Sequence, residues 1–248
     1  MAFFKVLLCA SWVLSVGTSA ATLIDKKETI SGVSVESGKE NTIRHYRGSI
    51  TKNFPYSLAA VKSSVVNFNE KCNNSLKDRR QFTDKNQDCK YHNENLVETV
   101  VLKSINQAGW TKDSNEVDRY VLGRLIYNRG SFGYYELVKI IEGVNDQNQK
   151  TITINTRMLT DQEAEVYTKP AFEKDSAFDH ADSTYILTEI GPKQTTLSYE
   201  YKAQTEHWVL NKEVSVPQVF ASISKSINDL VKAVDAESMI KSRDVASN

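Results

Sequence analysis

The sequence has no net charge and few of the residues that mark a dedicated chemical site. Lys and Arg number 31, Asp and Glu number 31, and the formal net charge is +0, so there is no global basic field to attract nucleic acid. The 10 glycines are not clustered into a loop that could hold phosphates, and neither H-E-x-x-H nor G-x-S-x-G occurs. We therefore expect no cofactor, no nucleic-acid partner and no catalytic centre of these recognisable kinds.

Long apolar runs are also scarce, and the one at the N-terminus is short. Lys5 precedes an apolar run from Val6 to Val16, and Thr18, Ser19 and Ala20 follow as small residues suited to a signal peptidase. A membrane-spanning helix needs about 20 apolar residues, so this run is too short to be an anchor. We interpret residues 1–20 as a cleaved signal peptide and expect a secreted or periplasmic protein.

Cysteine is rare as well, with only 3 in the chain. Cys9 lies within the expected leader, which leaves Cys72 and Cys89 at the two ends of a polar, charged loop. In an oxidising compartment two such cysteines indicate one disulfide. A metal site that combines them with His92 is the alternative, but it lacks a clear fourth ligand, and we expect no metal.

Alternating and helical patterns of apolar residues are present in the rest of the chain. The clearest strand has Ile152, Ile154 and Met158 on one side and Thr153 and Asn155 on the other. We expect a loose N-terminal arm over 21–41 and a flexible tail over 236–248. Strands are predicted over 42–51, 96–105, 116–128, 133–143, 149–159, 183–190 and 194–203, and helices over 55–72, 161–167 and 215–234.

The final predicted helix is the most strongly patterned segment. Ser215 and Pro217 form a helix start, and an apolar stripe runs from Phe220 to Val234, with Lys225 and Lys232 on the opposite side. Asp229 interrupts the basic residues, which argues against a helix that lies on a membrane. Short hairpin turns between the strands favour antiparallel pairing, so this stripe is expected to cover the protein's own sheet.

The order of elements resembles the START-like, or helix-grip, superfamily. The resemblance rests on "NFPYSLAAVKSSVVNF" directly after the first strand and on "SVPQVFASISKSINDLV" at the end. This superfamily includes lipid-transfer START domains, plant pathogenesis-related ligand binders, polyketide cyclases and coenzyme Q-binding proteins. The resemblance implies one α+β domain over 42–235, in which a curved antiparallel β-sheet wraps around a long C-terminal α-helix and leaves a hydrophobic cavity between them.

The apolar positions of the clearest strands and of the final helix are the candidate cavity residues. A sheet bent around a helix does not always fill its interior, and apolar concavities of this kind bind ligands. We therefore expect a hydrophobic small molecule or lipid as the partner. The predicted ligand-binding residues are Ile152, Ile154, Met158, Leu197, Tyr199, Tyr201, Phe220, Ile223 and Ile227.

Three alternatives remain open from the sequence. A cyclase-like or hydrolytic enzyme could use the same cavity if His45 and an acid face it, although the acids next to His180 lie in a stretch that reads as a polar loop. A secreted interaction protein could present an apolar patch around Phe172 and Phe178 on a solid core. The basic residues over 77–80 could make transient contact with a membrane surface.

Overall fold

A single antiparallel sheet forms the body of the protein. The computed structural model describes residues 24–66, 96–104, 115–127, 131–167 and 178–246. In this part of the chain, nine strands lie in the order β1-β2-β3-β9-β8-β7-β6-β5-β4. The strands are β1 (Ile24–Ile30), β2 (Val33–Glu40), β3 (Ile43–Phe54), β4 (Leu96–Ser104), β5 (Glu116–Tyr127), β6 (Ser131–Val144), β7 (Lys150–Met158), β8 (His180–Gly191) and β9 (Gln194–Thr205).

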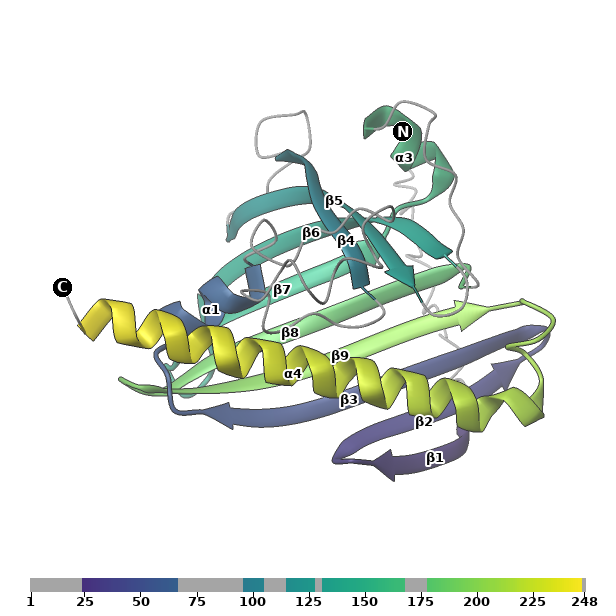
Figure 1. Ribbon diagram of the computed structural model, residues 1–248, viewed down its shortest axis with the longest axis horizontal. Coiled ribbons are helices and arrows are strands. Elements are labelled where there is room, and N and C mark those ends of the chain that lie inside the picture. The colour runs from purple at the N-terminus through teal and green to yellow at the C-terminus, as the bar shows by residue number, and fades with distance from the viewer. Residues whose placement is uncertain (1–23, 67–95, 105–114, 128–130, 168–177, 247–248) are drawn as a thin grey trace, which may run out of the picture.

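The described helices are distributed over the two faces of this sheet. They are α1 (Leu58–Val66), α3 (Asp161–Tyr167), the short 3₁₀ helix η2 (Glu213–Ser215) and α4 (Val216–Ala246). Figure 1 shows the sheet curving around α4, which runs past β9, β3 and β2 on one face, called here the inner face. α4 contacts β1, β2, β3 and α1. The helix-grip α+β fold expected from the sequence is thereby confirmed.

α4 approaches β3 closely because residue 48 has no side chain. A Cβ at Gly48 would lie 2.5 Å from Cγ2 of Ile223 and 2.7 Å from Cδ1 of Ile227. The apolar stripe of α4 thus rests directly on the strand backbone. It joins the main core with inward side chains of β2, β3 and β6 to β9 and with Leu58, Val61 and Val65 of α1.

The expected N-terminal arm over 21–41 is wrong for the residues that the structure describes. Residues 24–40 form the β1–β2 hairpin, whose turn residues Ser31 and Gly32 both have positive φ, 50° and 82°, as tight hairpin turns require. β1 is an exposed edge strand and therefore has a polar, loop-like sequence. β2 buries Val33 and Val35 completely.

The expected flexible tail over 236–248 is also wrong, because α4 continues to Ala246. Its last turns pack on α1 through polar contacts that an apolar stripe does not reveal. The hydroxyl of Ser238 donates to the hydroxyl of Ser64 at 3.0 Å, and Nζ of Lys241 donates to the hydroxyl of Ser63 at 2.7 Å.

The other described elements agree with the sequence predictions to within a few residues. α3 occupies the predicted positions, and Glu163 closes a capping box with Thr160, whose backbone N–H it accepts at 3.0 Å. α1 begins at Leu58 rather than at residue 55. The expected leader, Cys72, Cys89, His92, Phe172 and the basic segment 77–80 lie outside the described residues, and those expectations stay predictions. None of the described helices has the length and apolar character needed to span a membrane.

Candidate functional site

Small side chains occupy the middle of the inner face. The pairing register aligns Tyr46 of β3 with Ala203 of β9 and Ala181 of β8. The neighbouring row aligns Ser183 of β8 with Thr156 of β7. Ala181, Ser183, Ala203 and Thr156 are all buried. These four residues form what we call the floor.

Larger side chains surround the floor. Tyr134, Met158, Ala181 and Ala203 form one buried cluster, and the partly buried Phe178 and Tyr201 pack against it. Phe178 also makes an edge-on ring contact with Tyr46, with ring centroids 6.4 Å apart. Alanine, serine and threonine rise less far from the sheet than tyrosine, methionine and phenylalanine do. The residues of the floor are therefore smaller than the residues that border them.

The floor differs from the main core in the described residues that pack against it. The main core contains side chains of both α1 and α4. Among the described residues, the cluster that holds Ala181 and Ala203 contains none from either helix. The two helices that fill the concave side of the sheet thus pack beside the floor.

Two kinds of polar group lie at the floor. The hydroxyls of Thr156 and Ser183 are 2.7 Å apart and share one hydrogen bond, so the pair keeps one O–H for a further acceptor. Glu136 of β6 is 5% exposed and is paired in register with Met158. A molecule on the floor would therefore meet mostly apolar surface together with a hydroxyl donor and a carboxylate acceptor.

The nine predicted ligand-binding residues separate into two groups. Met158 lies in the cluster at the floor, and Tyr201 packs against both that cluster and the main core. The other seven are packed with each other and with α1 and α4 in the main core. Their contact with a ligand stays a prediction. The seven are Ile152, Ile154, Leu197, Tyr199, Phe220, Ile223 and Ile227.

Sequence reasoning missed the floor itself. Ala181 falls in a stretch that reads as a charged loop, whereas β8 already begins at His180. Ala203, Ser183, Thr156 and Glu136 are individually unremarkable in sequence. Only the register of four adjacent strands shows that they share one face. Alternation assigns Thr156 to the same face as Ile154 and Met158, and the register confirms that assignment.

The histidines considered for catalysis lie on the outer face. Arg44 and Tyr46 are buried on the inner side of β3, so the intervening His45 projects outward, where its Nε2 is 3.8 Å from Oε2 of Glu40. His180 lies 3.3 Å from Asp182 on the outward side of β8. Neither histidine reaches the floor. The described residues also contain no group of three or more His, Cys, Asp and Glu side chains placed to hold a metal ion.

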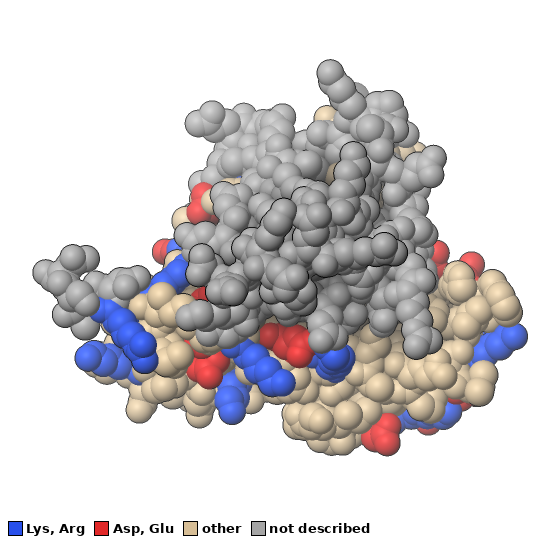
Figure 2. Space-filling view, viewed as in Figure 1, with Lys and Arg blue, Asp and Glu red and all other residues tan. Residues whose placement is uncertain are grey.

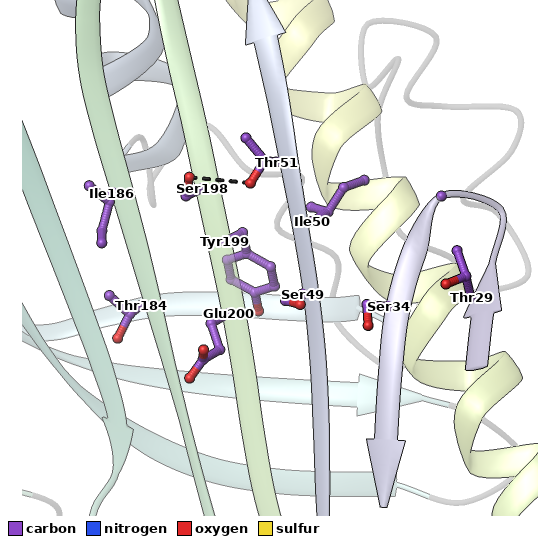
Figure 3. Close-up of a pocket in the computed structure, with 11 residues that line it drawn as sticks. Thr29, Ser34, Ser49, Ile50, Thr51, Thr184, Ile186, Ser198, Tyr199 and Glu200 are labelled. Atoms are coloured by element: carbon purple, nitrogen blue, oxygen red, sulfur yellow. Dashed lines mark hydrogen bonds between the residues drawn. The ribbon is translucent and has the colours of Figure 1, made fainter. Parts of the chain in front are cut away.

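A hollow lies on the outer face, across β2, β3, β9 and β8, with a volume of about 510 Å³. Figure 3 shows its lining of Ser34, Ser49, Thr51, Ser198 and other hydroxyl-bearing residues. It is open to solvent.

Glu200, which also lines this hollow, is already engaged. Burial acts to raise the pKa of its carboxyl, but hydrogen bonds from Lys202 and Arg47 outweigh that effect and hold the pKa below its ordinary value. An apolar molecule in the outer hollow would stay in contact with water and polar groups, which makes the floor the better candidate for a hydrophobic ligand.

Comparison with known proteins gives similarities of fold. No family model matches the chain, and no curated protein matches it. The solved structure of human StAR-related lipid transfer protein 5 is 13% identical over 85% of this chain and 86% of its own, with a TM-score of 0.47. A STAR-related lipid transfer protein from Xanthomonas axonopodis is 10% identical over 86% and 96%, with a TM-score of 0.45.

A START superfamily protein from Mycobacterium smegmatis is 14% identical over 78% of this chain and 97% of its own, with a TM-score of 0.41. The chain is thus similar to the START-like structures that its sequence pattern resembles. At these identities and TM-scores the similarity is confined to the fold, and what those proteins bind is not carried over to this chain.

Proposed function

We propose that this protein binds a hydrophobic small molecule on the floor of the inner face. The observation that carries the proposal is the buried cluster at the floor, which contains no described side chain from α1 or α4. Small residues there are bordered by larger aromatic and sulfur-containing side chains. Because the four floor residues are buried, a ligand there would be enclosed, and neither α1 nor α4 contributes to the described cluster that would hold it.

The polar groups of the floor define the ligand class more closely. A buried polar group that lacks a partner is costly, so a ligand with a hydrogen-bonding group at the right place gains specificity over a pure hydrocarbon. The Thr156–Ser183 pair supplies a donor. We therefore favour an apolar molecule that carries a hydroxyl or similar group, and a lipid is the first class to test.

Matched leucine substitutions test this proposal. Ser183 and Thr184 are consecutive residues of β8 that face opposite sides of the sheet. Leucine at 183 would raise the floor, whereas leucine at 184 would lie on the outer side. Each purified protein is exposed to a lipid extract and washed, and its bound molecules are extracted and identified by mass spectrometry.

We expect the natural protein and Thr184→Leu to retain the same hydrophobic species and Ser183→Leu to lose it. Equal retention by both variants would move the site away from the floor. A natural protein that retains no species would overturn the proposal. Thermal unfolding of each variant checks that the loss does not come from unfolding.

We also infer that the protein is exported and acts outside the cytoplasm. The support is the leader-like pattern of residues 1–20 and the pair of cysteines that remain after it. The N-terminal residue of the protein recovered from expressing cells tests this inference. Processing after Ala20 is the expected result, and a chain that begins at Met1 would contradict it.

A further inference from the structure

The turn between β9 and η2 presents apolar side chains to solvent. Trp208 is 70% exposed, Val209 36% and Val214 of η2 78%. Ile24, which is 55% exposed, begins β1, and Lys26 of the same strand forms an ion pair with Glu213 of η2 at 2.9 Å. We call these four residues the apolar tip.

The backbone of the turn is already hydrogen-bonded within the protein. The carbonyl of Val209 accepts from Lys212 N at 3.1 Å and from the Ser215 hydroxyl at 2.8 Å. The carbonyl of Leu210 accepts from the Tyr46 hydroxyl at 2.6 Å. An unpaired backbone group is the main cost of placing irregular backbone in an apolar medium. These two carbonyls keep their hydrogen bonds if the tip leaves water, so they do not add that cost.

Further hydrogen bonds fix the shape of the turn. The carbonyl of Asn211 accepts from Nε of Arg44 at 3.1 Å, and the Asn211 N–H donates to the carbonyl of His207 at 2.9 Å. A side chain displayed on a fixed turn loses little conformational freedom when it binds. Trp208 is therefore presented in a conformation that is ready for contact.

The charges near the tip include no excess of basic residues. Arg44, Lys26 and Lys212 lie among Asp25, Asp179, Glu206 and Glu213. Arg44 contacts both Asp25 and Glu213, and Nζ of Lys212 lies 4.8 Å from the centroid of the Trp208 ring. Basic and acidic side chains are also interspersed on the described surface seen in Figure 2. Attraction to the tip would thus depend on its apolar and aromatic side chains.

The tip lies at one border of the floor. Tyr46, whose hydroxyl holds the turn through Leu210, contacts Phe178 and is paired in register with Ala203. A surface that bound the tip would therefore lie next to the floor. The position of the tip next to the floor follows from the geometry of the turn and does not depend on what the floor binds.

We propose that the apolar tip inserts into the interfacial region of a lipid bilayer. Tryptophan, with an amphipathic ring and a nearby lysine, suits the boundary between head groups and acyl chains. A standard protein interface takes about 20–30 residues from each partner, whereas the tip consists of four side chains. Because the residues near the tip have no excess of basic charge, the tip is suited to zwitterionic lipid and does not need an anionic surface.

Vesicle partitioning tests the proposal. The purified full chain is sedimented with phosphatidylcholine vesicles at low and high sodium chloride, and with vesicles that also contain phosphatidylserine. Trp208→Ser and Val214→Ser are compared with Val166→Ser, which changes a 75% exposed valine on α3. All variants carry the same N-terminus, and thermal unfolding checks their folding.

We expect the natural protein to bind phosphatidylcholine vesicles with little dependence on salt. Trp208→Ser should weaken partitioning by about tenfold, the effect of removing one buried aromatic side chain from an apolar contact. Val214→Ser should weaken it less, and Val166→Ser should leave it unchanged.

Four results would overturn the proposal. Three are no binding by the natural protein, binding that requires phosphatidylserine and is lost at high salt, and binding unaffected by Trp208→Ser and Val214→Ser. The fourth is a change in oligomeric state in place of vesicle binding, which would identify a protein contact. Ligand retention on the floor is measured separately, so the two proposals can fail independently.

Discussion

Gly48 of β3 lies so close to Ile223 of α4 that a Cβ at position 48 would be 2.5 Å from Cγ2 of the isoleucine. Real Cβ atoms essentially never lie that close, so the side chains of Ile223 and Ile227, or α4 itself, must shift if residue 48 gains a side chain. The approach explains how the long C-terminal helix fits against this edge of the sheet. It also explains why the space beneath α4 is packed at this point.

Gly48→Ala should destabilise the protein by about 1–3 kcal/mol, the usual cost of overpacking a filled core. Denaturant unfolding measures the change. Gly143→Ala is the control, since its nearest atom is Oγ1 of Thr151 at 3.6 Å, and we expect it to have a much smaller effect. Equal effects of the two substitutions would contradict close packing at Gly48.

Arg44→Met should be among the most damaging single substitutions. The side chain is 1% exposed and donates hydrogen bonds to Asp25 at 3.0 Å and Ser37 at 2.8 Å, and also to Glu213. Its removal leaves the buried hydroxyl of Ser37 without its donor, which costs about 1–3 kcal/mol, whereas Asp25 and Glu213 are 34% and 60% exposed and can be solvated. We expect a loss of about 1–3 kcal/mol in the free energy of unfolding, because Arg44 joins β1, β2, β3 and η2.

Arg47→Met provides the matched control for that substitution. Arg47 is on the same strand but faces outward, where it is 49% exposed and paired with Glu200. Exposed ion pairs contribute about 0–1 kcal/mol. A loss for Arg47→Met as large as the loss for Arg44→Met would show that burial is not the cause.

The contribution of Glu163 should depend on pH. Hydrogen bonds from Arg157 are the main cause that lowers the pKa of its carboxyl from 4.5 to about 2. Because the folded pKa is below the unfolded value, the stabilisation is complete above pH 4.5 and is lost as pH falls through about 2. The stability difference between the natural protein and Glu163→Gln should shrink over that range. A difference that stays constant would contradict the shift.

Tyr46 should resist ionisation. Burial raises the pKa of its hydroxyl from 10.0 to about 12, against the opposing charge of Arg44. The raised value means that its contribution to stability is complete below pH 10 and is lost as pH rises through about 12. Subtracting the tyrosinate absorbance of Tyr46→Phe from that of the natural protein isolates this group. Ionisation near pH 10 while circular dichroism still reports a folded chain would contradict the burial argument.

Local patterns in the sequence predicted elements but not the relationships between distant ones. α3 was predicted from its capping box, in which Thr160 and Glu163 are three residues apart. The end of α4 was missed because its last turns pack through Ser238 and Lys241 rather than through apolar residues. The N-terminal hairpin was missed because an exposed edge strand has a polar sequence.

The candidate site was harder to predict for the same reason. Alternation placed Met158 on the inner face, but the predicted ligand-binding residues were chosen for their hydrophobicity. Most of them belong to the packed core. The floor is defined by the absence of bulk at Ala181 and Ala203, and their adjacency follows from the β8–β9 register. Likewise, Arg44 and Glu213 meet across a separation of 169 residues.

The most direct measurement is the contact between a bound molecule and the methyl groups of Ala181 and Ala203. In protein labelled at alanine methyls and loaded with the hydrophobic species that it retains, we predict intermolecular nuclear Overhauser effects to both methyls. Ser183→Leu should abolish them and Thr184→Leu should preserve them. Contacts confined to Ile154 and Leu197 of the core, or to Thr51 and Ser198 of the outer hollow, would contradict ligand binding on the floor.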